Sequence, residues 1–188
     1  ERVSGTVFGT GCNLRCLFCQ NYEISRGGKG VNLNGEELLS VFAALEAQGA
    51  ENINLVTPSP WLKRLIPILK EYKTRGKLPI VWNSSGCEDA ADLRELEGCV
   101  DVWLPDFKYS DDDMARSYSG AENCFAKARA ALAEMRRQTP HEEFDERGMM
   151  KKGVCVRHLV LPGGVKNAEG VMPVSYTHLR AHETGRNL

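Results

Sequence analysis

The sequence predicts an α/β fold built on a parallel sheet, and three observations carry this prediction. Short apolar segments of strand length alternate with longer segments whose apolar residues recur at helical spacing. Strands separated by helices run parallel, because each crossover returns the chain to the same edge of the sheet. The strand segments are also almost continuously apolar, as expected for a sheet that is buried on both faces. The predicted sheet is either open or curved into a partial barrel.

The composition limits both the class of protein and its partners. The 188 residues suffice for one domain with a buried core. A net charge of −1, from 24 basic and 25 acidic residues, leaves no basic excess that would favour nucleic acid. No apolar run approaches a membrane span, and no signal peptide opens the chain. The seven cysteines are odd in number and three of them are clustered, which favours a reducing, cytoplasmic setting over a disulfide framework.

The first predicted strand runs from Val3 to Phe8 and leads directly into a cysteine-rich loop. After this loop, Asn34 is expected to cap a helix, because Glu37 three residues later completes a capping box. The apolar stripe of this helix comprises Leu38, Val41, Phe42 and Leu45. Gly49 is expected to end it.

Four further strands and four further helices follow in alternation. The strands are predicted over residues 53–57, 78–83, 100–104 and 154–161. The helices are predicted from Ser59, over 89–97, after the acidic run 111–113, and over 121–138. Pro67 lies inside the helix that opens at Ser59 and is expected to kink it or end it early. Residues 144–152 are predicted to form a charged hairpin or loop.

The end of the chain departs from this alternation. We expect one domain over residues 1–170 and an unstructured or artefactual tail over 171–188, because the tail has no clear apolar stripe. His178 and His182 lie four residues apart and could share a metal on a helix face, although two histidines alone are a weak signal. The chain begins with Glu1 and enters a strand almost at once, so it is expected to be a fragment of a longer protein.

Three cysteines fall within eight residues directly after the first strand. Cys12, Cys16 and Cys19 have the spacing C-x3-C-x2-C, in a loop of glycine and amide residues that is poor material for a core. Three thiolates can hold three irons of a cubane cluster, which leaves one iron open to a substrate or cofactor. The alternatives are structural zinc or a chance grouping. Structural zinc needs four ligands, usually in paired knuckles, whereas the other cysteines here are scattered singly.

Each predicted strand brings polar residues to its carboxyl end. The first strand runs into the cysteine loop, and the next three end at residues 57–59, 83–86 and 106–108. The fifth strand carries Arg157 and His158 and ends at residues 162–163. The carboxyl ends of parallel strands meet at one rim, which is where ligands bind in this architecture. Ordinary loop polarity and helix capping remain the preferred interpretation for Ser59 and for the acidic run 111–113. A surface ion pair remains the alternative for Asp106 and Lys108.

The stretch from Gly5 to Ser25, with Gly-Cys-Asn-Leu-Arg-Cys-Leu-Phe-Cys-Gln-Asn at its centre, resembles the cluster-binding loop of the radical S-adenosylmethionine (SAM) superfamily. It is most similar to the branch of pyruvate formate-lyase activating enzyme. The resemblance extends over about residues 5–164. It implies a partial (β/α) barrel truncated after about the fifth strand. It also implies a 4Fe-4S cluster on Cys12, Cys16 and Cys19, with SAM on the open iron.

The resemblance also implies roles for residues outside the cysteine loop. Phe18, between the second and third cysteines, matches an aromatic residue beside the adenine of SAM, although a core phenylalanine is equally compatible with the sequence. Asp106 and Lys108 match an Asp-Leu-Lys element that contacts the ribose. Asn83 and Ser84 match a polar turn near the methionine carboxylate.

Two later positions and one departure complete this comparison. Arg157 matches an arginine on the fifth strand, and Leu159 matches an apolar residue against the adenine. The Gly-Gly-Glu element that binds the SAM amino group in similar proteins is absent. Residues 55–60 occupy its place, so Thr57 or backbone carbonyls would have to substitute for it.

The chemistry implied by the resemblance is reductive cleavage of SAM to a 5′-deoxyadenosyl radical that abstracts hydrogen from a substrate. An electron donor of the flavodoxin or ferredoxin type and a glycyl-radical enzyme partner are expected, with no membrane and no nucleic acid. The sequence indicates no separate catalytic side chain. A radical SAM enzyme acting on RNA, a peptide or a small molecule is the alternative, and a non-catalytic zinc module is a further one.

Overall fold

The computed structural model describes residues 3–179. Its strands are β1 (Gly5–Phe8), β2 (Ile53–Val56), β3 (Ile80–Ser84), β4 (Val102–Pro105), β5 (Glu143–Phe144) and β6 (Met150–Val154). Its helices are α1 (Tyr22–Ser25), α2 (Gly35–Ala47), α3 (Leu62–Arg75), α4 (Ala90–Arg94), α5 (Asp112–Ser119), α6 (Cys124–Gln138) and α7 (Val165–Leu179). A single 3-10 turn, Ser59–Trp61, precedes α3.

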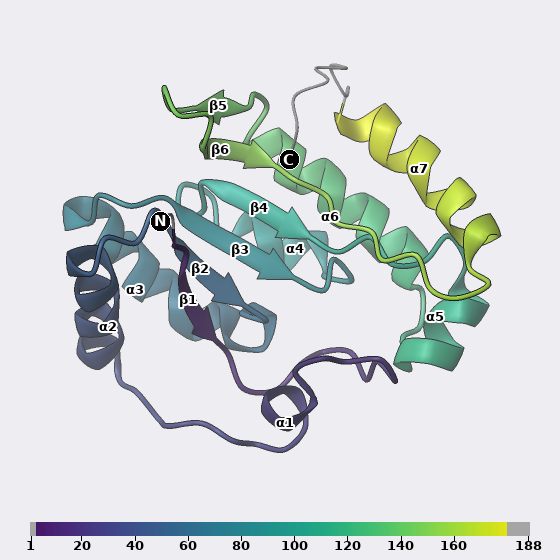
Figure 1. The fold of residues 1–188 in the computed structure, drawn as a ribbon, viewed down its shortest axis with the longest axis horizontal. Helices are drawn as coiled ribbons and strands as arrows, with labels where there is room; N and C mark the ends of the chain where they lie inside the picture. The colour runs from purple at the N-terminus through teal and green to yellow at the C-terminus, as the bar shows by residue number, and fades with distance from the viewer. Residues whose placement is uncertain (1–2, 180–188) are drawn as a thin grey trace.

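The strands form one sheet in the order β1-β2-β3-β4-β6-β5. Neighbouring strands from β1 to β6 pair in parallel, and β5 adds an antiparallel edge. The arrows of β1 to β4 point the same way, and the cysteine loop and α1 lie beyond their tips (Figure 1). Parallel strands that are neighbours in both chain and space are the arrangement of a (β/α) barrel, so the predicted α/β fold is confirmed.

The core lies between the sheet and its helices, of which α4 and α6 lie behind the sheet in Figure 1. Ile53 and Leu55 of β2 point into this core, as do Trp82 of β3 and Trp103 of β4. The two indole rings meet edge-on with their centroids 6.4 Å apart. This arrangement is favourable for aromatic pairs beyond the area they bury. The opposite side chains of these strands, including Asn83, face away from the helices.

Helix boundaries follow the expected signals at α2 but not at α3. The Asn34 side chain accepts from the Glu37 amide, and the Glu37 carboxylate accepts from the Asn34 amide, so the capping box is confirmed. Helix α3 continues through Pro67, so it does not end early there, which was one of the two expected outcomes. An interior proline costs a helix about 3 kcal/mol. Burial of each large side chain on α3 contributes about 1.5–3 kcal/mol to stability, so the packing of the helix outweighs the cost of the proline. The buried side chains are those of Leu62, Leu65, Leu69 and Tyr72.

The last parallel strand begins earlier than predicted. Strand β6 covers Met150–Val154, and β5 joins it in the hairpin expected over residues 144–152. Beyond β6 the chain still follows β4: the Cys155 amide donates to the Trp103 carbonyl (2.8 Å) and the Arg157 amide to the Pro105 carbonyl (2.9 Å). The start of β6 was not predicted as a strand, because its lysines interrupt the apolar pattern.

Helix α7 spans the residue at which the domain was expected to end. It runs from Val165 to Leu179, so the boundary expected at residue 170 falls inside a helix. Val171 is fully buried in the core, and Asn167 bonds the Ser110 amide (2.7 Å) and the Lys108 carbonyl (2.8 Å). These contacts hold 165–174 against the domain. Residues 180–188 of the expected tail, including His182, lie outside the described residues, so the pair of His178 and His182 stays a prediction.

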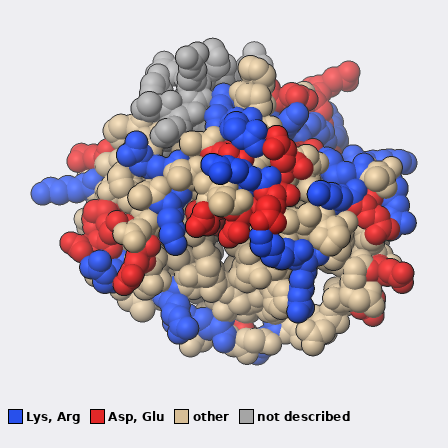
Figure 2. Space-filling model, turned by 180° about the vertical axis from the view of Figure 1, so that it is seen from behind, with Lys and Arg blue, Asp and Glu red and all other residues tan. Residues whose placement is uncertain are grey.

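The surface behind the sheet carries charges of both signs. Lys and Arg side chains are interspersed with Asp and Glu over the face seen in Figure 2. Ion pairs link several of the elements, such as Arg137 of α6 with Glu97 (2.9 Å) after α4. Within residues 3–179, no helix combines the length and the apolarity that crossing a membrane requires.

Candidate functional site

The cysteine loop follows β1 and is positioned by backbone hydrogen bonds. The Arg15 amide donates to the Ser119 carbonyl (2.8 Å), and the Leu17 amide to the Tyr118 carbonyl (2.9 Å), so the loop docks on the last turn of α5. Gly11 turns the chain with a φ of +79°, a conformation that favours glycine. The three thiols therefore lie on a loop whose path is fixed by its neighbours.

Each of the three thiols is half-buried and has a hydrogen-bonding partner. Cys12 Sγ accepts from the Leu14 amide (3.4 Å), and Cys16 Sγ from the Ser119 hydroxyl (2.9 Å). Cys19 Sγ lies 3.3 Å from the Ser25 hydroxyl. Burial raises the pKa of Cys12, and the nearby Cys16 and Cys19 raise that pKa further, although the Leu14 amide opposes them. A charge on Cys16 or Cys19 therefore affects the ionisation of Cys12.

The chemistry of the three loop thiols is that of an iron–sulfur ligand set. A cubane cluster binds each cysteine thiolate through a separate iron, and three thiolates leave one iron open. Cys87 and Cys124 lie buried beside the loop, but they hydrogen-bond each other, which lowers the pKa of Cys87 and raises that of Cys124. Three partly exposed thiols with hydrogen-bond partners therefore fit a cluster with one open iron.

Asn13 joins this loop to the turn after β3. Its side-chain amide donates to the Cys87 carbonyl (2.7 Å), and its side-chain oxygen accepts from the Ser85 hydroxyl (3.0 Å). The turn after β3 is thereby fixed beside the first cysteine. Nothing in the local sequence marks Asn13 for this role, because its partners lie more than 70 residues away.

Four residues predicted from different strand ends form one connected polar group. The Asp106 carboxylate accepts from Lys108 Nζ (2.5 Å) and from Arg157 Nε (2.7 Å). The Arg157 guanidinium also donates to the Asn83 side-chain oxygen (2.9 Å). Burial raises the pKa of Asp106, but Lys108 and Arg157 outweigh it and hold that pKa below its usual value. Asp106 is therefore an ionised acceptor at neutral pH.

Thr57 occupies a strained backbone position at the end of β2. Its φ is +56°, which is unusual for a β-branched residue and costs about 1–3 kcal/mol. The turn is held from both sides: the Thr57 amide donates to the Asn83 carbonyl (2.9 Å), and Gly9 packs so closely that a Cβ there would lie 2.7 Å from the Thr57 carbonyl oxygen. The structure thus maintains a backbone outlier at the carboxyl end of β2.

The remaining predicted residues differ in exposure. Phe18 is half-buried and packs on the apolar cluster that also contacts Cys12 and Cys16. Leu159 is 55% exposed. His158, between Arg157 and Leu159, hydrogen-bonds the Phe107 carbonyl through Nδ1 (2.7 Å), and its buried Nε2 has no partner within the described residues. Asp111 caps α5 through the Met114 amide (2.8 Å), which confirms capping as its role.

A buried carboxyl, that of Glu88, underlies the rim between β2 and β3. It accepts from the Ser59 hydroxyl (2.5 Å), the Trp82 indole (3.0 Å) and the Ser84 hydroxyl. Burial raises the pKa of Glu88 against the effect of these donors. Ser84 is therefore turned beneath the rim, and only its backbone faces the site. Glu88 could not be predicted as a buried residue, because nothing in its local sequence distinguishes it from an exposed glutamate.

Replacement of Glu88 by alanine is expected to destabilise the protein by about 3 kcal/mol. The substitution leaves a cavity, and it leaves buried hydrogen-bond donors without an acceptor. Glu88→Gln keeps the volume and one acceptor, so we expect it to lose about 1 kcal/mol. Urea unfolding of the reduced protein measures both. Glu95→Ala on the exposed surface serves as the control. Equal losses for the alanine and glutamine variants would contradict this role.

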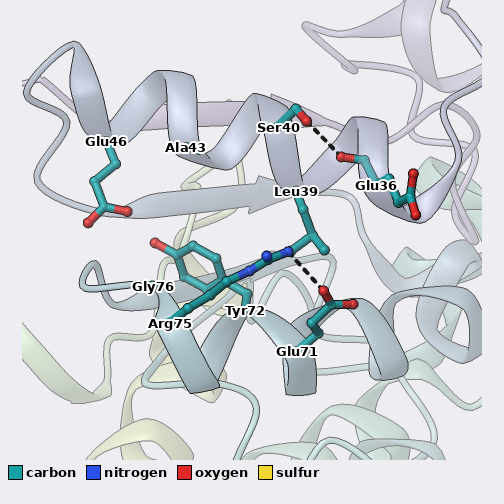
Figure 3. A pocket seen from close by; sticks show the side chains of 9 residues that line it. All are labelled: Glu36, Leu39, Ser40, Ala43, Glu46, Glu71, Tyr72, Arg75 and Gly76. Carbon is teal, nitrogen blue, oxygen red and sulfur yellow. Dashed lines mark hydrogen bonds and ion pairs between the residues drawn. The ribbon is translucent and has the colours of Figure 1, made fainter.

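A separate groove of about 480 Å³ lies between α2 and α3 (Figure 3). Glu36, Glu46 and Glu71 line it, and Arg75 is already paired with Glu71 (2.8 Å). No thiol lines this groove, and none of the predicted site residues does. The polar rim at the strand ends is therefore the better candidate for chemistry.

Comparison with known proteins decides the family. Residues 6–163 match the radical SAM superfamily. The chain belongs to this superfamily. Radical SAM proteins bind a 4Fe-4S cluster and S-adenosylmethionine, so the resemblance seen in the cysteine loop is confirmed at the level of the superfamily and its cofactors.

Two curated proteins are similar in sequence to this radical SAM protein. The uncharacterised protein MJ0674 of Methanocaldococcus jannaschii is 32% identical over 136 residues, which cover 66% of this chain and 40% of that protein. Pyruvate formate-lyase-activating enzyme of Staphylococcus epidermidis is 26% identical over 170 residues, which cover 84% of this chain and 61% of that enzyme. The chain therefore spans less than two thirds of the length of either relative.

Two solved structures share the fold. Streptococcus suis SuiB bound to its precursor peptide SuiA matches with a TM-score of 0.68 at 7% identity, over 94% of this chain and 37% of that one. HydG, a maturase of the [FeFe]-hydrogenase, matches with a TM-score of 0.62 at 12% identity, over 97% of this chain and 41% of that one. At these identities the similarity concerns the fold alone.

Proposed function

We propose that this radical SAM protein holds its 4Fe-4S cluster on Cys12, Cys16 and Cys19. The observation that carries the proposal is the loop itself: three half-buried thiols, each with a hydrogen-bonding partner, at the carboxyl ends of the parallel strands. The carboxyl ends of strands are where ligands bind in this architecture. When bound, the cluster and SAM supply a 5′-deoxyadenosyl radical that abstracts hydrogen from a substrate.

The polar group at the strand ends is proposed to bind SAM. Asp106, ionised and partly exposed, accepts hydrogen bonds from ribose hydroxyls, and Lys108 and Arg157 keep its carboxylate oriented. Asn83 and the backbone of Ser84 lie on the next strand, where they bind the methionine end. Phe18 and Leu159 supply apolar surface for the adenine and exclude water from it.

The SAM amino group is proposed to bind at the turn around Thr57. The Thr57 amide already donates to Asn83, so its carbonyl and its hydroxyl are the groups left to accept. The strained φ of Thr57 supports this assignment, because such outliers persist where a functional constraint holds them. A hydrogen-bond acceptor is what an ammonium group requires.

The narrower function that we propose is activation of a glycyl-radical enzyme, with electrons from a flavodoxin or ferredoxin. The similarity to pyruvate formate-lyase-activating enzyme supports it. The competing proposal is a radical SAM enzyme that acts on a peptide, an RNA or a small molecule. A protein partner that acquires a glycyl radical, detected by electron paramagnetic resonance (EPR), would favour the first, and its absence with turnover of another substrate would favour the second.

The decisive experiment is anaerobic reconstitution of the complete protein with iron and sulfide, followed by reduction in the presence of SAM. We expect a 4Fe-4S EPR signal that changes when SAM is added, and formation of 5′-deoxyadenosine. Protein incubated without reductant is the control. A reconstituted protein that carries zinc without sulfide, or that forms no 5′-deoxyadenosine, would overturn the proposal.

A further inference from the structure

A buried chain of hydroxyl groups ends on one of the three loop thiols. The Ser119 hydroxyl donates to Cys16 Sγ at 2.9 Å, and Tyr109 Oη lies 2.5 Å from Ser119 Oγ. A serine hydroxyl has one proton, and Ser119 uses it on the sulfur, so Tyr109 donates to Ser119. The direction of both hydrogen bonds is thereby set: tyrosine to serine to sulfur.

The two hydroxyl groups of this chain are shielded from water. Ser119 is fully buried and Tyr109 is 2% exposed. The donor to Cys12 Sγ is the Leu14 backbone amide, and the partner of Cys19 is the partly exposed hydroxyl of Ser25, so neither of these thiols has a second hydroxyl behind its partner within the described residues. A hydrogen bond in a dry environment is electrostatically stronger than one in water, and a second hydroxyl behind it polarises the first.

The chain is also anchored against movement. The Ser119 carbonyl accepts from the Arg15 amide, so backbone and side chain of the same residue both hold the loop. Tyr109 packs with Leu14 and Ala115 in the apolar cluster beneath the loop. These contacts fix the Ser119 hydroxyl beside Cys16 Sγ.

We propose that Ser119, aligned by Tyr109, is a positioning residue that raises the reduction potential of the cluster. Hydrogen bonds to the sulfurs are among the features that set the potential of an iron–sulfur cluster. Reduction adds negative charge that the ligating sulfur shares, and a donor at that sulfur stabilises the reduced form more than the oxidised form. This inference rests on the proposed assignment of Cys16 as a cluster ligand.

The test is a potentiometric titration of the reconstituted protein, monitored by EPR, with Ser119→Ala and Tyr109→Phe. For Ser119→Ala we expect the ratio of reduced to oxidised cluster at a fixed potential to fall about tenfold, which is about 59 mV for one electron. Tyr109→Phe leaves the serine in place, so it should shift the ratio in the same direction but less. Ser40→Ala, on the far α2, is the matched control and should not shift it.

The outcomes separate this inference from the function on which it rests. A wild-type protein that forms no cluster defeats the proposed function itself. A wild-type cluster whose potential both variants reproduce defeats the role of Ser119 alone. If Ser119→Ala fails to assemble a cluster, Tyr109→Phe decides, since its smaller change leaves the donor to Cys16 intact. Thermal unfolding of the apo-proteins reports any general loosening, which by itself would not produce a one-directional shift in potential.

Discussion

Replacement of Cys16 by serine is expected to abolish cluster assembly and with it the cleavage of SAM. An alkoxide is far harder to form than a thiolate, so the variant offers two iron ligands instead of three. Iron and sulfide content after reconstitution should fall by more than about tenfold, since even the loss of a residue that only orients a ligand costs about 10–100-fold in metal affinity. The same result is expected for Cys12 and Cys19.

Cys155→Ser is the matched control for these variants. Cys155 is also half-buried, and burial raises its pKa, but it follows β6 and is not part of the loop. We expect it to retain the full complement of iron and sulfide. If Cys16→Ser bound as much iron and sulfide as the wild type, or if Cys155→Ser lost as much as the loop variants, the assignment of ligands would be wrong.

Gly86→Ala is expected to cost about 4 kcal/mol of stability or to prevent folding. Gly86 has a φ of +75°, and a Cβ there would lie 1.9 Å from the carbonyl oxygen of Asp106. Backbone strain contributes about 1–3 kcal/mol and overpacking about as much again. Because the clash is with the backbone of a residue in the polar group, neither strand end can yield without displacing the site.

Gly98→Ala separates the cost of backbone strain from the cost of the steric clash. Gly98 has nearly the same φ, +77°, but a Cβ there would meet nothing within 4 Å. We expect this variant to lose about 1 kcal/mol, which reflects conformation alone. Urea unfolding under reducing conditions measures both variants. Equal losses would show that the contact with Asp106 is unimportant.

The sheet could be predicted because its strands are short apolar runs between helices, and burial of such runs leaves few alternatives. The exceptions have local causes. At α3, packing of Leu65 and Leu69 outweighs a proline that was expected to kink the helix or end it early. At β6, lysines obscure a strand that lies between β4 and β5, and at α7 the contacts of Val171 and Asn167 secure a helix with a weak apolar pattern.

The candidate site could be predicted only where its residues lie close together in the sequence. The spacing of the cysteines is local, and it indicates their chemistry by itself. Glu88, Tyr109 and Ser119 act through partners that are distant in the sequence or hidden from water, and a single sequence contains no signal for either condition. Asp106 and Lys108 were proposed by resemblance, and their common hydrogen-bond group with Arg157 became visible only in three dimensions.

The docking of the cysteine loop on α5 has a consequence for how this sequence can diverge. The contacts at positions 15 and 17 are made by backbone amides, while the Arg15 side chain is exposed and Leu17 is 74% exposed. Natural variation at these two positions should therefore be nearly free, whereas inserting or deleting one residue between the cysteines would move an amide out of register with its carbonyl. In this protein the interval between the thiols is under stronger constraint than the residues that fill it.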